Sequence, residues 1–229
     1  MILTDDNFAT IVKAVELGRR LYDNLVKYIR FQMGALAGMI LTFLGASILN
    51  IVSGIPFLPM QTLWVNFTTQ VFQSIGLGYG EGGEGVMARK PRKPEQPILT
   101  RADTIWFVIA GFTMAIAALA VIAGYEDKGD ELARTMGLTT FSIANLMFSF
   151  TARDAVRSVF SLDTFRDKTF LIATGMSVAA IIFVTELRVF QRVFHTVELS
   201  GNQWLLCLGA GSAIIVVSEI RKFLLRRAQ

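Results

Sequence analysis

Cysteine and histidine are almost absent from this sequence of 229 residues, which contains one of each. A lone cysteine, Cys207, excludes a scaffold held together by disulfide bonds. One cysteine and one histidine are too few for a structural zinc site, and His195 has no partners for a Ser-His-Asp or Cys-His catalytic set. We therefore expect no metal centre of this type and predict no cofactor.

Charge is also scarce, because only 17% of the residues are charged while 53% are hydrophobic, with a mean hydropathy of +0.51. Soluble domains have about 25% charged and about 45–50% apolar residues. A soluble core of this length cannot hide so much apolar surface. Disorder is excluded, since disordered chains combine low hydrophobicity with high net charge. The composition predicts a membrane protein.

Long apolar runs are what the sequence does contain, and six of them can cross about 30 Å of hydrocarbon as helices. They do not alternate apolar and polar residues as membrane strands do. We therefore predict an all-α fold, a polytopic bundle of six transmembrane helices in a membrane domain at 31–220. The six runs cover residues 31–53, 60–78, 104–124, 135–151, 169–187 and 203–220.

The basic residues predict the orientation of these helices. Most of the 22 Lys and Arg residues lie before the first run, after the second and fourth runs, and in the tail at 221–229. By the positive-inside rule these segments face the cytoplasm, so we expect a multi-pass protein with both termini cytoplasmic, in the plasma membrane. We expect the tail to meet anionic lipid headgroups rather than nucleic acid. Its basic residues are Arg221, Lys222, Arg226 and Arg227.

The segment at 1–30 is too polar for a secretory signal and predicts a cytoplasmic, stalk-like helix. Apolar residues recur in it at three- and four-residue steps, and Thr4 to Asn7 supply capping oxygens. No proline precedes Pro56, so we expect one continuous helix over 8–53, roughly 69 Å long. A helix of this length that extends into the cytoplasm needs something to pack on.

The run at 60–78 carries a stripe of polar side chains on one helical face. Amide and hydroxyl oxygens are adequate ligands for hard cations, so the stripe is a candidate ion path. The alternative is hydrogen bonding to neighbouring helices. None of the 18 carboxylates lies at mid-membrane, so a divalent cation would keep its full charge at low dielectric. The stripe consists of Thr62, Asn66, Thr69, Gln70 and Gln73.

Other features favour packing or turns over chemistry. Gly34 and Gly38 form a Gly-x-x-x-Gly motif that allows close helix approach. The glycine-rich segment at 78–83 lacks the Lys-Ser/Thr ending and the preceding strand of a phosphate loop, so a turn is predicted. Cys207 is interpreted as a packing residue, and His195 as a surface residue, with a pH sensor as the alternative.

Four stretches of the chain form an ordered series of motifs. They are MILTDDNFATIV at 1–12 with Gly18-Arg19 and Tyr22-Asp23-Asn24, then Leu63-Trp64-Val65-Asn66 with Thr69, then Pro91-Arg92-Lys93-Pro94 with Pro97-Ile98-Leu99, and finally Gln203-Trp204-Leu205 with Glu219-Ile220-Arg221-Lys222. The series resembles the cation-transporting P-type ATPases of the calcium-pump-like branch. It is similar to the end of their phosphorylation domain, their stalk and their later membrane helices. The six runs would correspond to helices five to ten of that family.

The resemblance implies a ligand set that keeps oxygens but has lost its charge. On the family's fifth helix the ligand positions fall at Leu36 and Met39, which cannot coordinate a hard cation. On the eighth helix the position falls at Asn145. A divalent-cation site of the family's usual type is therefore not expected. On the sixth helix, with an amide in place of the acidic ligand, the positions are Asn66, Thr69 and Gln70.

The sequence has neither the family's phosphorylated Asp-Lys-Thr-Gly-Thr loop nor its Thr-Gly-Glu loop, and no nucleotide-binding domain is recognisable. The chain by itself is thus predicted to be no enzyme, since nothing in it can carry phosphoryl transfer. The leading hypothesis is a non-catalytic accessory subunit that packs on another integral membrane protein. The alternatives are the membrane half of a split pump, with ATPase domains supplied in trans, and a passive cation channel.

Overall fold

The described part of the chain is helical throughout. In the computed structural model it contains helices and their connections and no strand, so the prediction of an all-α fold is confirmed for these residues. The described residues are 8–80, 85–88, 97–154, 157–161 and 167–227. Three predicted features lie wholly or partly outside them: the capping residues at 4–7, the glycine-rich segment at 78–83 and the proline-flanked basic motif at 91–94.

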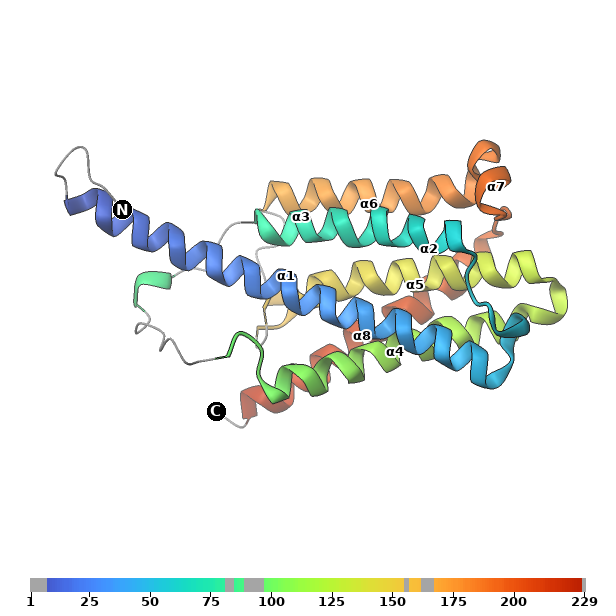
Figure 1. Ribbon diagram of the computed structural model, residues 1–229, viewed down its shortest axis with the longest axis horizontal. Helices are drawn as coiled ribbons and strands as arrows, with labels where there is room; N and C mark the ends of the chain where they lie inside the picture. The colour runs from blue at the N-terminus through green and yellow to red at the C-terminus, as the bar shows by residue number, and fades with distance from the viewer. Residues whose placement is uncertain (1–7, 81–84, 89–96, 155–156, 162–166, 228–229) are drawn as a thin grey trace.

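Helices lie over all six predicted apolar runs and form an elongated bundle (Figure 1). The long elements are α1 (Phe8–Leu49), α4 (Arg101–Tyr125), α5 (Asp130–Ala152), α6 (Lys168–Glu186) and α8 (Gly201–Arg227). The run at 60–78 is built of α2 (Pro59–Val65), the π-helical η2 (Asn66–Val71) and α3 (Phe72–Gly78). The short connecting elements are η1 (Ile51–Gly54), η3 (Val86–Ala88), η4 (Glu126–Lys128), η5 (Val159–Ser161) and α7 (Arg188–Phe194).

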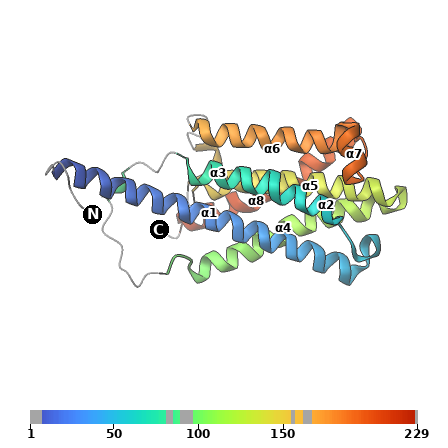
Figure 2. The same ribbon diagram turned by 45° about the horizontal axis from the view of Figure 1, so that its top comes forward.

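The bundle is arranged around α5, which contacts α1, α4, α6, α8 and η2. In Figures 1 and 2, α3 and α6 lie on one side of α5, and α4 lies on the other. The start of α1 and the end of α8 lie at the same end of the bundle, here named the termini end, and α7 lies at the opposite, far end (Figure 1). Because α5 is buried along most of its length, its polar side chains lie inside the bundle.

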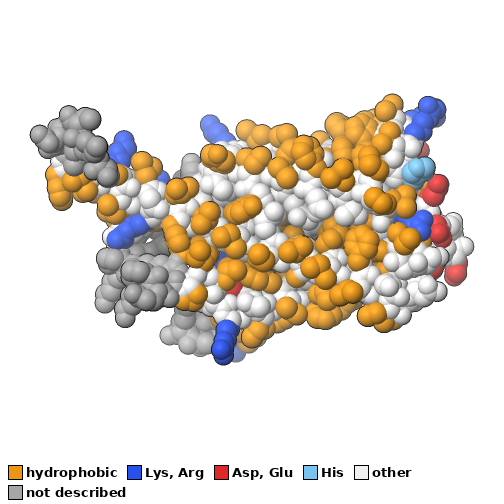
Figure 3. Space-filling model, viewed as in Figure 1, with side chains coloured by type: hydrophobic (Ala, Val, Ile, Leu, Met, Phe, Trp, Pro, Cys, Tyr) orange, Lys and Arg blue, Asp and Glu red, His pale blue; other side chains and the backbone are white. Residues whose placement is uncertain are grey.

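Four helices of the described chain are long and apolar enough to cross a membrane. The fifth long helix, α5, is too polar to join them, and η2 interrupts the run at 60–78. On the face in Figure 3, apolar side chains cover the middle of the molecule and charged side chains gather toward its two ends. The four helices span Phe8–Leu49, Arg101–Lys128, Lys168–Glu186 and Gly201–Arg227.

The long first helix ends at Leu49 rather than at the predicted Ser53. Asn50, directly after the helix, has a left-handed φ of 54°, and Val52 and Ser53 follow with 47° and 55°, so the helix cannot continue into this segment. Long-range contacts hold this turn: the backbone N–H of Val52 donates to Oε1 of Glu126 at 2.9 Å, and Nε of Arg134 donates to the carbonyl of Ile55 at 3.1 Å. Nothing in the local sequence indicates these partners.

Two glycines of α1 lie where the neighbouring helices come closest. A Cβ added at Gly34 would lie 2.3 Å from the ring of Phe148 on α5. One added at Gly38 would lie 2.9 Å from Met114 on α4. Both positions therefore lie in helix contacts that a larger residue would disturb.

The basic tail begins as part of a helix, because α8 continues through Arg227. Arg226 and Arg227 are exposed, as contact with headgroups requires. Lys222 does not fit that prediction: it is 1% exposed, and its Nζ lies 3.9 Å from Oε1 of Glu219. Its position on α8 faces the bundle rather than the surface.

Candidate cation path

The polar stripe coincides with a change of helix type. Between α2 and α3 the backbone forms the π-helical segment η2, which begins at Asn66 and contains Thr69 and Gln70. Such segments are rare, and they occur frequently at functional sites. The hydroxyl of Thr69 donates to the carbonyl of Val65 at 2.7 Å, which leaves its oxygen able to accept or to coordinate. Helical periodicity alone had predicted the stripe but not this segment.

Gln73, at the end of the stripe toward the termini, belongs to a hydrogen-bond network between three helices. Its Nε2 donates to Oγ of Ser177 on α6 at 3.1 Å, and its Oε1 accepts from Oγ of Ser149 on α5 at 2.8 Å. Ser177 Oγ also lies 3.1 Å from the carbonyl oxygen of Thr68. Both ends of the Gln73 amide are thus used in packing, which favours the structural interpretation for this residue.

The contact between Gln73 and Ser149 sets the level of Asn145. The stretch from α2 to α3 runs in the same direction as α5, from the far end toward the termini end (Figure 1). One turn before Ser149 is Asn145, and about one turn before Gln73 is Thr69. The structure therefore brings Asn145 to the level of η2, and α5 contacts that segment.

The Asn145 amide is the least satisfied polar group at this level. Asn145 is 0% exposed, and within the described ranges neither Nδ2 nor Oδ1 has a hydrogen-bond partner. A buried amide without partners costs about 1–3 kcal/mol, and native proteins keep such groups where an ion, a water or a reaction uses them. Its neighbours in level, Thr69 and Gln70, are also buried, and Asn66 is partly buried.

The path is polar but uncharged. The described residues contain no cluster of three or more His, Cys, Asp or Glu that could hold a metal ion. On α1, Leu36 is half-exposed and Met39 is buried, and neither carries an oxygen. The arrangement thus places neutral oxygen atoms of η2 and α5 at one level of the bundle. Thr62 does not lie at the level of Asn145. It lies nearer the far end, where its hydroxyl donates to the carbonyl of Leu58.

Comparison with known proteins identifies the family of this helical arrangement. The model of the family described as "Cation transporting ATPase, C-terminus" matches residues 54–224. The chain belongs to this family. Its described helices and its family together make it an integral membrane protein, the C-terminal membrane domain of a P-type ATPase.

Named relatives agree with this family. The "Calcium-transporting ATPase" of Bacillus subtilis is 34% identical over 91% of the chain. The "Probable cation-transporting ATPase F" of Mycobacterium tuberculosis is 33% identical over 95% of it, and the "Calcium-transporting ATPase 1" of Schizosaccharomyces pombe is 31% identical over 99%. The chain spans 24%, 24% and 25% of the lengths of these relatives, about a quarter of each.

Ion pairs at the termini end of this ATPase domain join segments that are distant in sequence. Nε of Arg30 on α1 lies 3.1 Å from Oδ1 of Asp103 on α4, and the Arg153 guanidinium lies 3.1 Å from Oδ2 of Asp167. Asp103 also forms a capping box with Thr100 at the start of α4. The spacing of Thr100 and Asp103 could have indicated the cap, but no local signal indicates that Arg30 is the partner.

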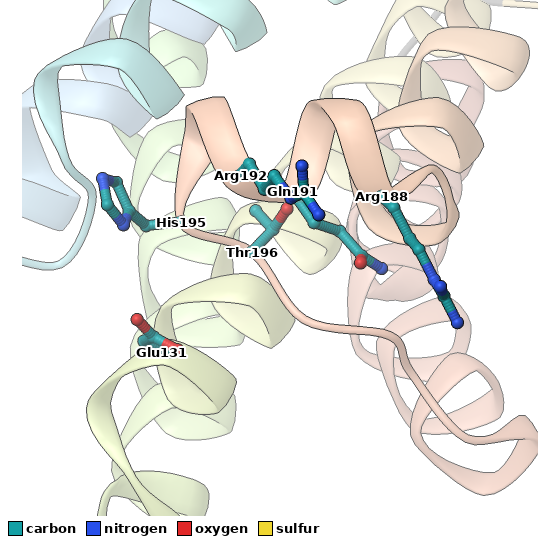
Figure 4. A pocket seen from close by; sticks show the side chains of 6 residues that line it. All are labelled: Glu131, Arg188, Gln191, Arg192, His195 and Thr196. Carbon is teal, nitrogen blue, oxygen red and sulfur yellow. The ribbon is translucent and has the colours of Figure 1, made fainter.

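At the far end, His195 borders a polar hollow of about 490 Å³. Figure 4 shows that its side chains do not converge, since Arg188 and His195 lie at opposite sides of the hollow. Gln191 is already engaged, because its Nε2 donates to the carbonyl of Thr185 at 2.6 Å. His195 ends α7 with a left-handed φ of 51° and is exposed, as predicted for a surface residue. The lining residues are Glu131, Arg188, Gln191, Arg192, His195 and Thr196.

Proposed function

We propose that this domain is the ion-conducting membrane part of a cation-transporting pump, whose ATP-hydrolysing domains lie on a different chain or region. The family match and the names of the relatives support transport of a cation. The observation that carries the proposal is the buried, unpartnered amide of Asn145 at the level of η2. An uncharged path through the centre of a helix bundle needs such oxygens to replace the water around the ion.

The proposal includes six membrane spans with both termini in the cytoplasm. The run at 60–78 and α5 are added to the four apolar helices, because polar residues inside a bundle need not face lipid. Buried polar side chains on α5, among them Thr139 and Ser142, support this placement. Exposed cations at the termini end, among them Arg101, Arg157 and Arg226, support the orientation.

A partner chain is the second part of the proposal. Beyond the bundle, α1 extends as a stalk (Figure 1), and several of its apolar side chains are exposed. Leu17 is 58% exposed, Leu21 67% and Leu25 43%, and their four-residue spacing places them along one face of the helix. A row of large exposed apolar residues outside the membrane is typical of an interface. This favours a membrane complex in which the stalk packs on another subunit, either in a split pump or with the chain as a non-catalytic accessory subunit.

Purification from membranes in mild detergent tests the proposal, and a partner should accompany the protein in a fixed ratio. In that complex, Asn145→Leu should weaken the stimulation of ATP hydrolysis by the transported cation. We expect at least about a tenfold rise in the half-stimulating concentration, since even groups that only orient ligands change metal affinity this much. Ca²⁺ and K⁺ are titrated separately, because the names of relatives favour the first and the uncharged ligands the second.

Gln73→Leu is the matched control for stability, because it also replaces a buried amide by leucine. It removes two hydrogen bonds and should lower the unfolding free energy by about 1–3 kcal/mol, whereas Asn145→Leu removes an unpartnered amide and should not. An unchanged cation response in Asn145→Leu contradicts the ion path, and a monodisperse protein without a partner contradicts the partner chain. Cation flux into liposomes by the protein without ATP would instead indicate a passive channel.

A further inference from the structure

An apolar groove opens between α4 and α8 near the termini end of the bundle. Its volume is about 520 Å³, within the range of ligand pockets. Its walls stay exposed, with Ile105 61%, Ile220 56% and Leu224 60% accessible. Because the groove is lined almost wholly by apolar side chains and is open to the surface, its occupant must be apolar along most of its length. The lining includes Ile105, Ile109, Val217, Ile220, Leu224 and Arg221.

One charged side chain, that of Arg221, lines this groove. Its guanidinium lies over the ring of Trp106, 4.6 Å from the ring centroid, so the aromatic ring orients it. Arg221 also borders a small cavity with Asp103, which forms an ion pair with Arg30 at 3.1 Å. Asp154 borders the same small cavity, so two carboxylates lie there with the guanidinium groups of Arg30 and Arg221. The surplus of positive charge near the groove comes from Arg226 and Arg227, which are exposed in the last turn of α8.

An apolar groove with surplus positive charge near one end matches the chemistry of an anionic phospholipid. A phospholipid presents an acyl chain and, at one end of it, a negatively charged phosphate. A wholly apolar protein helix in this groove would offer no anion to the exposed cations in the last turn of α8. Arg226 and Arg227, exposed in the last turn of α8, add positive charge in the direction of a headgroup.

We propose that the groove between α4 and α8 binds one anionic phospholipid, with an acyl chain against Ile105, Ile220 and Leu224 and its phosphate at Arg221. The assignment rests on the orientation in the proposed function, which places this end of the bundle at the cytoplasmic leaflet. Basic pockets between membrane helices on that side bind anionic headgroups. The site is independent of Asn145, so loss of the cation response would leave lipid binding unchanged.

Native mass spectrometry of the purified complex tests the site, with phosphatidylglycerol and phosphatidylcholine of identical acyl chains added in equal amounts. We expect one phosphatidylglycerol to be retained in preference to phosphatidylcholine. Arg221→Gln should reduce that preference about fivefold, the effect of one basic residue near a membrane surface. Glycerol phosphate, which has no acyl chain, should not displace the lipid.

Two further variants keep the proposal open to refutation. Ile109→Trp fills the groove but leaves Arg221 in place, so it should reduce the retention of both lipids. Its melting temperature should stay close to that of the unmodified complex, which shows that the variant is folded. Lys168→Gln removes an exposed cation from the first turn of α6, outside the groove lining, and should change nothing. Equal retention of both lipids by the unmodified protein, or an equal loss in Lys168→Gln and Arg221→Gln, overturns the proposal.

Discussion

Gly111 on α4 shows how much one absent side chain decides at the contact of α1 and α4. A Cβ added there would lie 2.9 Å from the backbone carbon of Ala37 and 2.9 Å from the backbone nitrogen of Gly38. Backbone atoms cannot move aside as a side chain can, so the two helices would have to separate. Close helix approach through small residues is a main source of stability in membrane bundles.

Gly111→Ala is therefore expected to lower the unfolding free energy by about 1–3 kcal/mol, the usual cost of overpacking. Gly124→Ala on the same helix is the control, because a Cβ there meets nothing within 4 Å. It should be neutral or slightly stabilising, since alanine favours helix over glycine. Melting temperatures of the two variants in the same detergent measure the difference, and equal values would contradict the close contact.

At the residue scale, the sequence predicted the polar stripe and Asn145 as candidates. It could not tell which of these side chains are satisfied by hydrogen bonds and which are not. Gln73 and Asn145 are both amides in apolar runs, and nothing local distinguishes them. They differ because Ser149 and Ser177, far along the chain, satisfy Gln73, while no described residue satisfies Asn145. Hydrogen-bond satisfaction depends on the neighbouring helices.

At the scale of elements, the connection between α1 and α2 carries the clearest strain. Ser53 has φ of 55° and is exposed, so its backbone conformation is unfavourable without any packing to compensate. Val52 shares the left-handed conformation but is 1% exposed and contributes to the core. Of the two, Ser53 is the position where strain can be removed without loss of buried area.

Ser53→Gly should raise the unfolding free energy by about 0.5–1 kcal/mol, because glycine adopts positive φ without strain. The gain stays this small because glycine loses more backbone entropy on folding than serine does. Ser47→Gly, at an exposed position inside α1, should lower it by a similar amount, since glycine disfavours the helix interior. Denaturant or thermal unfolding of both variants gives the comparison. A loss of stability in Ser53→Gly would show that the turn is not strained.

Element boundaries were predictable only where the local sequence sets them. The start of α4 follows from Thr100 and Asp103, which cap it. The turn after α1 is held by Glu126 and Arg134, and η2 interrupts a run whose hydrophobic pattern is that of an ordinary helix. Periodicity reports which face is apolar, but it does not report where a distant side chain captures a backbone group.

At the scale of the whole molecule, the single cysteine offers a direct test of orientation. Cys207 is 0% exposed, so the unmodified protein should react little with a maleimide that cannot cross membranes. Asp127 at the far end and Arg157 at the termini end are both exposed. Each can be replaced to give one accessible thiol at a known end of the bundle.

Intact cells should show labelling of Asp127→Cys, whereas Arg157→Cys should be labelled only after the membrane is permeabilised. This outcome follows from the excess of Lys and Arg at the termini end. The unmodified protein and a denatured sample set the lower and upper limits of labelling. The reverse pattern would place the termini outside and would remove the cytoplasmic leaflet from the lipid site at Arg221.

The sequence by itself determined the membrane environment, the helical fold and the family, because composition, run length and motif order can be read without knowing which helices are in contact. Only the tertiary structure decided which polar groups are buried, which have hydrogen-bond partners and which border a groove. Asn145 lacks a partner at the level of η2, Lys222 is buried, and Arg221 borders a groove formed by two helices far apart in the chain. Burial and hydrogen bonding are set by long-range helix packing, which no single stretch of sequence contains.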